Sequence, residues 1–356
     1  MPIIDQYFKE MKERGASDLH MVIGFPPMLR LRGELVRMEQ YPVLTPESNR
    51  EILFEMLGPV QRKMIDENRD FDMAYELDGV GRFRCNFLFQ HRGIGAVFRI
   101  IPTEILTIDQ LNLPDAVRDI AHFNRGLVLI TGPTGSGKST TLAAIIDFIN
   151  KNYSKHIITI EDPLEFVHKN NKSIFTQREV GSHTKSFSDA LKVASRENPD
   201  IILVGEMRDL ITISLALASA ELGILVFGTL HTNSAAKTVD RIINAFPSDQ
   251  QAQTRTMLSE SLKAIVAQQL LKTKDGKGRC AANEILIATS ALASIIRDGK
   301  ISQINSLIQT GSKLGMQTMD QHLMQLIKDE RITPEAAYEK AIEKAPFEAM
   351  IPDDED

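Results

Sequence analysis

The chain has 356 residues, 43% of them hydrophobic, so it has enough apolar material for about two domains that each bury a core. Its 41 basic and 47 acidic side chains give a net charge of −6, Trp is absent, and aromatic residues make up 6%. An acidic chain with few aromatic side chains is unlike a non-specific nucleic-acid coat, so we expect no nucleic-acid partner. The two cysteines, Cys85 and Cys280, exclude a disulfide framework and a four-thiolate zinc site, and we expect both to be reduced packing residues.

The N-terminal region has the pattern of a small mixed domain. Its expected elements are a helix over residues 3–14, strands over residues 29–35 and 82–90, a turn over residues 91–95 and a returning strand over residues 96–101. Along residues 82–90, aromatic residues and a cysteine alternate with polar ones, which is typical of a strand with one buried face. The buried face is expected to hold Phe83, Cys85, Phe87 and Phe89. No basic region followed by an apolar run begins the chain, so we expect no secretory signal and a cytoplasmic location.

The character of the chain changes after residues 102–115, which begin with a proline, contain another at position 114 and form the expected linker. Short apolar runs separated by helical segments follow at residues 127–130, 157–160, 201–204, 224–227 and 285–287. Apolar strands that alternate with helices indicate a parallel sheet covered on both faces, and so an α/β fold. Residues 211–230 carry a single charge, but their halves predict a buried helix and then a buried strand, not a membrane span.

A phosphate-binding motif lies between one apolar strand and a predicted helix. Residues 132–139 read Gly-Pro-Thr-Gly-Ser-Gly-Lys-Ser and match the P-loop pattern G-x-x-x-x-G-K-[ST]. Its glycines let backbone N–H groups converge on phosphate oxygens, and the start of the following helix adds a positive dipole. We expect Lys138 to reach the β- and γ-phosphates of a nucleotide and the Ser139 hydroxyl to bind Mg²⁺. The expected nucleotide-binding residues are Thr134, Gly135, Ser136, Gly137, Lys138, Ser139 and Thr140.

Acidic residues follow two of the apolar strands, at the edge where ligands of open α/β sheets bind. Glu206 follows residues 201–204 and is expected to hold Mg²⁺ through a water, because Gly205 stands where many P-loop enzymes have aspartate. Glu161, Asp162 and Glu165 follow residues 157–160, and one of them could activate the attacking water. Glu165 is favoured, but their spacing leaves the other two open, and the segment could also be a solvated loop or the start of a helix.

Further side chains could contact a transferring phosphoryl group. His231 follows the strand at 224–227 and could sense a γ-phosphate through a hydrogen bond, although a single histidine is more often structural. Arg84 and Arg99 lie on different strands of the predicted hairpin and could stabilise developing charge, as an arginine from another domain or subunit often does. They could equally be solubilising residues, and Arg82 and Arg92 compete for the same role.

Several separated motifs resemble the secretion ATPase superfamily that powers type II secretion and type IV pili. The family's Walker A, Asp box, Walker B and His box match residues 132–139, 160–165, 204–209 and 228–232. Ser17-Asp18-Leu19-His20 and the segment at residues 315–320 match it as well. The resemblance is greatest to PilT-type pilus retraction ATPases and extends over nearly the whole chain.

The resemblance implies a domain organisation and an assembly. It implies a smaller PAS-like α+β N-terminal domain over residues 1–101 and a RecA-like P-loop ATPase domain over residues 116–350. Independently of the resemblance, the acidic residues near the end of the sequence predict an acidic tail over residues 351–356. The resemblance also implies a homohexameric ring in which ATP lies between the two domains and a neighbouring subunit contributes residues.

The same resemblance implies roles for single residues. The glutamate that matches Glu165 is taken in this family as the catalytic base, and the one that matches Glu206 supports Mg²⁺. The arginines that match Arg84 and Arg99 reach the γ-phosphate from the N-terminal domain. The resemblance also favours a catalytic role for His231.

The implied function is ATP hydrolysis that drives type IV pilus retraction, in which pilin is depolymerised during twitching motility. The implied partners are further copies of the chain, a PilC-like inner-membrane platform protein and a paralogous retraction ATPase. The implied location is therefore cytoplasmic and peripheral at the inner membrane. Extension-type and type II secretion ATPases usually carry an extra N-terminal domain and a four-cysteine zinc insertion, so this chain fits the retraction branch and we expect no zinc.

Two other functions stay open. Retraction ATPases typically carry an Ala-Ile-Arg-Asn-Leu-Ile-Arg-Glu helix, and the matching segment at residues 291–298 has Ala293 in place of the first arginine. Residues 262–271 and 274–279 resemble the accessory retraction paralogue PilU, so the chain could be an accessory subunit with a mainly structural role. A RecA-like nucleic-acid translocase is the second alternative, and stimulation of ATP hydrolysis by DNA would reveal it.

Overall fold

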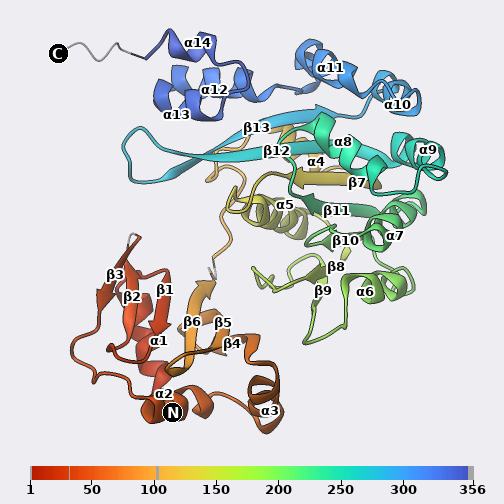
Figure 1. Ribbon diagram of the computed structural model, residues 1–356. Helices are drawn as coiled ribbons and strands as arrows, with labels where there is room; N and C mark the ends of the chain where they lie inside the picture. The colour runs from red at the N-terminus through yellow and green to blue at the C-terminus, as the bar shows by residue number, and fades with distance from the viewer. Residues whose placement is uncertain (1, 32, 102–103, 352–356) are drawn as a thin grey trace. The chain divides into compact units, whose positions relative to one another are not determined.

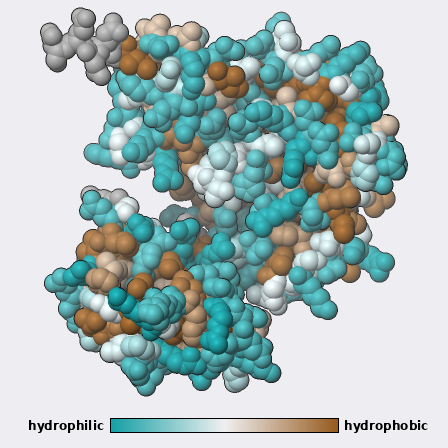
Figure 2. Space-filling model, in the orientation of Figure 1, coloured by the Kyte–Doolittle hydropathy of each residue, from teal (hydrophilic) through white to brown (hydrophobic). Residues whose placement is uncertain are grey.

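The computed structural model describes residues 2–31, 33–101 and 104–351, and these fall into two compact units, residues 1–104 and 105–356 (Figure 1). Each unit has a sheet and a hydrophobic core of its own. Pro102, at the start of the expected linker, and residues 352–356 of the expected acidic tail lie outside the described residues. Hydrophilic residues cover most of the face shown in Figure 2.

The described part of the N-terminal unit forms a six-stranded antiparallel sheet with the strand order β3-β2-β1-β6-β5-β4. The strands are β1 (Asp18–Met21), β2 (Met28–Leu31), β3 (Glu34–Arg37), β4 (Asp70–Leu77), β5 (Gly81–Gln90) and β6 (Gly93–Ile101). The helices are α1 (Ile4–Glu13), α2 (Pro46–Glu55) and α3 (Pro59–Asn68). The apolar stripe of α1 contributes Phe8 to the core, where its ring stacks on that of Phe83 with 4.0 Å between the ring centroids.

Two strand predictions for this unit have different outcomes. The strand expected over residues 82–90 is confirmed, with Phe83, Cys85 and Phe87 fully buried and Phe89 partly buried. The single strand expected over residues 29–35 is wrong. Gly33 has a φ of 96°, a region that favours glycine, and the chain turns there so that β3 pairs antiparallel with β2.

The described part of the second unit contains a seven-stranded sheet with the order β13-β12-β7-β11-β10-β8-β9. Its strands are β7 (Gly126–Thr131), β8 (His156–Glu161), β9 (Ile174–Glu179), β10 (Ile201–Val204), β11 (Leu225–Leu230), β12 (Leu262–Lys272) and β13 (Arg279–Ile287). The predicted parallel arrangement is confirmed for β7, β8, β10 and β11. It is wrong for residues 285–287, because β12 and β13 form a hairpin and β13 pairs antiparallel with β12.

Helices cover both faces of this sheet, as predicted. They are α4 (Asp115–Ile120), α5 (Lys138–Asn152), α6 (Phe187–Ala194), α7 (Leu210–Glu221), α8 (Ala235–Asn244), α9 (Gln251–Ser261), α10 (Ser290–Arg297), α11 (Ile304–Thr310), α12 (Met319–Lys328), α13 (Pro334–Lys340) and α14 (Ala345–Glu348). On β7, Leu127 and Leu129 pack into the core shared with α6 to α11, while Val128 and Ile130 pack into the core shared with α4 and α5. This alternation buries the strand that leads into the P-loop on both sides.

Several smaller predictions from the sequence can be compared with the structure. Ile108 and Leu113, within the expected linker, are buried in the core that contains α4 and α5. Cys85 and Cys280 are free and buried, as expected. Residues 211–230 form most of α7 and then β11, as predicted. Across the described ranges, every helix is too short or too polar to cross a bilayer.

Candidate functional site

The P-loop, residues 132–139, joins the end of β7 to the start of α5, as the motif predicted. Gly132, Gly135 and Gly137 have φ angles of 147°, 77° and 83°, a region that favours glycine. A Cβ atom at Gly135 would meet no described atom within 4 Å. Ser136 is buried, and its Oγ has no hydrogen-bond partner among the described residues. The loop therefore has open space at Gly135 and a Ser136 hydroxyl without a hydrogen-bond partner, next to the N-terminus of α5. This combination is typical of an anion-binding site.

Lys138 turns back onto the loop that precedes it. Its Nζ donates hydrogen bonds to the carbonyl oxygens of Gly132 and Pro133, at 2.9 and 3.0 Å. Burial lowers the pKa of the Lys138 ammonium, and the carboxylates of Glu206 and Glu165 oppose that shift. The charges of both predicted acidic residues therefore act on the ammonium of the P-loop lysine.

The residues of this site fit a nucleotide with Mg²⁺. Thr134 is exposed at the top of the loop, and Ser139 and Thr140 are half-buried on the first turn of α5. Lys138 supplies a cation, which donates hydrogen bonds to two backbone carbonyl oxygens of the loop. The Ser139 hydroxyl and the Glu206 carboxylate are the hard oxygen donors that Mg²⁺ prefers.

Glu206 and His231 contact each other at the carboxyl edge of the sheet. They follow β10 and β11, which are neighbouring parallel strands, so their ends meet. His231 Nε2 lies 3.0 Å from Glu206 Oε1, and Arg208 Nε lies 2.6 Å from the same oxygen. Burial by itself would raise the pKa of Glu206, but the hydrogen bonds and charges of Arg208 and His231 outweigh it and lower that pKa. Glu206 is therefore held as a carboxylate.

The three acidic candidates after β8 occupy different environments. Glu165 and Asp162 are exposed, whereas Glu161 is half-buried at the end of the strand. The backbone N–H of Glu165 donates to Glu161 Oε2 at 3.3 Å. Burial raises the pKa of Glu161 to about 7, and the charge of Glu165 adds to that shift. Glu161 thus holds the backbone of the segment that carries Glu165, and the Glu165 side chain is exposed to solvent.

A cavity of about 340 Å³ opens beside Glu206. It is lined by Glu206, Met207, Arg208, Leu230, His231, Thr232 and Arg241. Arg208 could have been singled out from the sequence, since it lies inside the Walker B match, but its ion pair with Glu206 was not anticipated. Arg241, on α8, has no motif around it that would have identified it. The cavity places two further guanidinium groups beside the predicted metal-supporting carboxylate.

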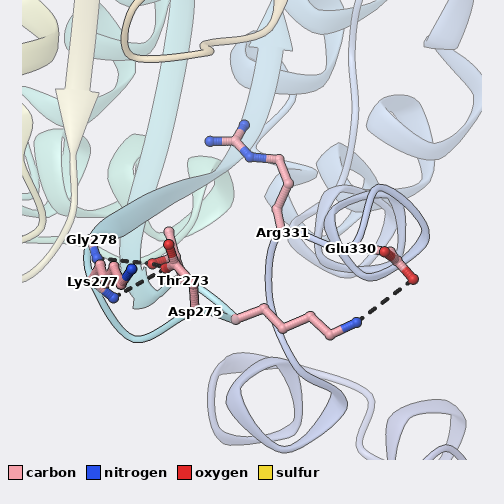
Figure 3. A pocket seen from close by; sticks show the side chains of 7 residues that line it. Thr273, Asp275, Lys277, Gly278, Glu330 and Arg331 are labelled. Carbon is pink, nitrogen blue, oxygen red and sulfur yellow. Dashed lines mark hydrogen bonds and ion pairs between the residues drawn. The ribbon is translucent and has the colours of Figure 1, made fainter.

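A wider hollow of about 590 Å³ lies at the turn between β12 and β13, where Figure 3 shows Arg331 and Glu330 across from the turn. The turn is closed by its own hydrogen bonds, with Asp275 Oδ1 accepting from the backbone N–H of Lys277 at 3.1 Å. Lys274 Nζ lies 3.7 Å from Glu330 Oε1. None of the residues predicted to contact nucleotide lines this hollow.

Arg84 and Arg99 lie directly opposite each other on β5 and β6 of the N-terminal unit. Both are exposed. Arg99 Nε donates to Oδ1 of the buried Asp18 at 2.8 Å, and Arg84 Nε lies 3.9 Å from Asp72 Oδ1. Burial would raise the pKa of Asp18, but hydrogen bonds from Ser17 and Arg99 lower it. The fold thus brings the two predicted arginines together, on a different unit from the P-loop.

Comparisons with known proteins find relatives among secretion and pilus ATPases. A family model described as type II/IV secretion system protein matches residues 1–344. The chain is 51% identical over 329 residues to the type IV pilus retraction ATPase PilT of Pseudomonas aeruginosa, covering 92% of this chain and 95% of that protein. It is 42% identical over 347 residues to the type IV pilus ATPase PilU of the same organism, covering 98% and 91%.

A solved structure described as the pilus retraction motor PilT with bound ADP superposes with a TM-score of 0.91 at 46% identity. The match covers 98% of this chain and 100% of that one. It confirms the predicted fold class, a RecA-like α/β ATPase domain with a smaller N-terminal domain. The resemblance first seen in separated motifs thus holds over the whole fold.

Proposed function

The chain belongs to the family of type II/IV secretion system proteins, and we propose that its ATP hydrolysis drives retraction of type IV pili. The observation that carries the proposal is the match of nearly the whole chain to a retraction motor that binds ADP. The P-loop supports it further, because the charges of Glu206 and Glu165 act on the ammonium of Lys138. In such a motor, hydrolysis around a ring does mechanical work that removes pilin from the base of the pilus.

The P-loop residues bind the nucleotide in this proposal. The N–H groups of Thr134 to Thr140 face the phosphates, and Lys138 exchanges the carbonyl oxygens of Gly132 and Pro133 for phosphate oxygens. Ser139 and Glu206 hold Mg²⁺, Glu206 through a water. When bound, the ion neutralises charge on the β- and γ-phosphates.

Glu165 is the proposed catalytic base, which takes a proton from the attacking water. Its exposed carboxylate supports this role, and its backbone is held by Glu161. His231 is proposed to donate a hydrogen bond toward the γ-phosphate from its place beside Glu206. Arg84 and Arg99 are proposed to stabilise the charge of the transferring phosphoryl group from an N-terminal unit in the assembled ring.

The proposed assembly is a homohexamer that works against an inner-membrane platform protein of the PilC type. The proposed location follows from that partner, since the ring is cytoplasmic and peripheral at the inner membrane. The names of the ADP-bound relative and of PilU support an ATPase that acts on pili. A paralogous retraction ATPase is a further proposed partner.

Deletion of this protein alone tests the proposal. If the chain is a principal retraction motor, the strain should carry many surface pili that do not retract when they are imaged. The purified chain should hydrolyse ATP in the presence of Mg²⁺, and Lys138→Ala should lose tight nucleotide binding. Normal pilus number and retraction in the deletion strain would rule out the role of principal motor.

A second candidate is an accessory retraction subunit. Ala293, half-buried on α10, stands where retraction ATPases typically have arginine, and the chain is similar to PilU over nearly its full length. In that case hydrolysis by this chain is dispensable while the ring itself is needed. Comparing Glu165→Gln with the full deletion in cells separates the two: an accessory ring tolerates the substitution, and a motor does not.

A further inference from the structure

A buried amide side chain lies directly beneath the P-loop. In the parallel pairing of β12 with β7, Ala267 is level with Thr131, so Gln268 lies beside the start of the loop. Gln268 is 2% exposed, and its Nε2 donates to the carbonyl oxygen of Ser136 at 2.6 Å. The two residues are 132 positions apart in sequence, so the loop motif does not reveal the contact.

Three elements besides β12 fix the orientation of this amide. While Nε2 binds the P-loop, Gln268 Oε1 accepts from Thr141 Oγ1 on α5 at 2.8 Å and from Asn283 Nδ2 on β13 at 3.0 Å. Thr141 is 2% exposed and Asn283 fully buried. If the amide oxygen and the NH₂ group exchanged places, Gln268 Oε1 would face the carbonyl oxygen of Ser136, and the NH₂ groups of Gln268 and Asn283 would face each other. The amide is therefore held with its donor toward the loop.

The contact determines the direction of one peptide group in the loop. Because a trans peptide is planar, its C=O and N–H point in opposite directions. Gln268 binds the carbonyl of Ser136, so the N–H of the same peptide, which belongs to Gly137, points away from β12. The loop glycines allow this close approach, since a Cβ at Gly132 would lie 2.2 Å from the Gln268 carbonyl oxygen and one at Gly137 would lie 3.0 Å from Nε2.

We propose that Gln268 is a positioning residue that orients the Gly137 N–H toward the β-phosphate of a bound nucleotide. The inference rests on the proposed nucleotide site of the P-loop. Without the hydrogen bond from Gln268, the Ser136–Gly137 peptide is free to rotate, and its carbonyl oxygen can face the phosphates that the loop must bind. A buried carbonyl left without a donor also gains by turning toward solvent.

Substitution of Gln268 tests the proposal on the full chain. Gln268→Met keeps the length of the side chain and removes its hydrogen bonds, and Gln268→Glu keeps the acceptor and removes the donor. We expect both to raise the Kd for ATP and for ADP by about tenfold, with less than about a twofold change for AMP, which lacks the β-phosphate. Titration calorimetry with ATP, ADP and AMP in the presence of Mg²⁺ measures these constants.

Matched variants separate positioning from a general loss of structure. Gln269→Met changes the neighbouring residue on β12, which faces the other side of the strand, and should bind ATP, ADP and AMP like the wild type. Thr141→Val removes one donor to the Gln268 amide and should raise the Kd for ATP and ADP by about threefold. This milder variant tests the proposal even if the Gln268 variants fold poorly.

The outcomes distinguish this inference from the proposed function. Wild-type Kd values for ATP and ADP in folded Gln268→Met would overturn the inference and leave the nucleotide site intact. Equal weakening of ATP, ADP and AMP would overturn it in favour of a general structural role. If the wild-type chain itself did not bind ATP or ADP, the result would contradict the proposed nucleotide site, and the role proposed for Gln268 would be contradicted as well.

Discussion

His231 Nε2 lies 3.0 Å from Glu206 Oε1, so two residues with different predicted tasks are bound to each other. One is proposed to support Mg²⁺ and the other to contact phosphate. Arg208 Nε lies 2.6 Å from the same carboxylate oxygen. Protein side chains therefore orient the carboxylate at the ends of β10 and β11, which is the kind of preorganisation that catalysis requires.

We expect His231→Ala to lower kcat for ATP hydrolysis by about 10- to 100-fold and to change the Kd for ATP by less than about threefold. The reason is that a donor near the γ-phosphate contributes most where charge develops during the reaction. Steady-state hydrolysis and an ATP titration measure the two values. His122→Ala, at an exposed histidine just after α4, is the control and should change neither. Equal loss of binding and turnover would argue for a structural histidine.

Glu165 and Glu161 are expected to respond differently to removal of the charge. Glu165→Gln should lower kcat by about 10³-fold while ATP still binds, because the base is lost. Glu161→Gln keeps an oxygen that accepts from the Glu165 N–H, so its kcat should fall by less than about tenfold. Single-turnover hydrolysis with bound ATP measures both. If Glu161→Gln were the more damaging of the two, Glu165 would not be the base.

The stability of the P-loop unit should depend on pH through Glu161. Burial raises the pKa of this carboxyl group to about 7, above its ordinary value of 4.5. The folded form then binds the proton more tightly than the unfolded form, so the stabilisation is complete below pH 4.5 and is lost as the pH rises through 7. We expect wild type to lose on the order of 2 kcal/mol more unfolding free energy than Glu161→Gln between pH 5 and 8. Urea unfolding at both pH values measures this, and identical pH dependence would contradict it.

Substitution of the two arginines of the N-terminal unit should affect its thermal stability to different extents but ATP hydrolysis to the same extent. Arg99→Ala removes the guanidinium group that binds Asp18 at 2.8 Å and leaves this buried carboxylate without its main ion-pair partner. The melting temperature of the unit should therefore fall by about 4–8 °C. Arg84→Ala removes a long, exposed ion pair with Asp72 and should lower it by less than about 2 °C. Both should reduce hydrolysis by the assembled protein by about 10³-fold. Unchanged hydrolysis in Arg84→Ala would assign that residue to the surface only. Calorimetry and ATPase assays give the two readouts.

The parts of the fold that could be predicted are those encoded by neighbouring residues. The P-loop occupies eight consecutive positions, 132–139, and β7, β8, β10 and β11 are continuous apolar runs because they are buried on both faces. β9 was not predicted because it is an edge strand whose mostly half-buried residues do not form a continuous apolar run. β12 was not predicted because it follows α9 directly, without a turn that would mark its start.

The site itself was predictable only where a motif marks it. Glu206 and His231 each follow a recognisable strand, and parallel pairing of the two strands then brings them together. The contact between Gln268 and the loop depends on which strand lies next to β7, and that strand comes late in the chain. Local patterns carry no information on such pairing, so it had to come from the structure.

The burial of both cysteines has a practical consequence for thiol chemistry. A thiolate is the reactive form of cysteine, and burial raises the pKa of the Cys85 and Cys280 thiols. Maleimide dyes should therefore leave the native protein unmodified. A cysteine introduced at one exposed position would take up a fluorophore selectively, without removal of the natural pair, and would allow the movements of single motors to be followed.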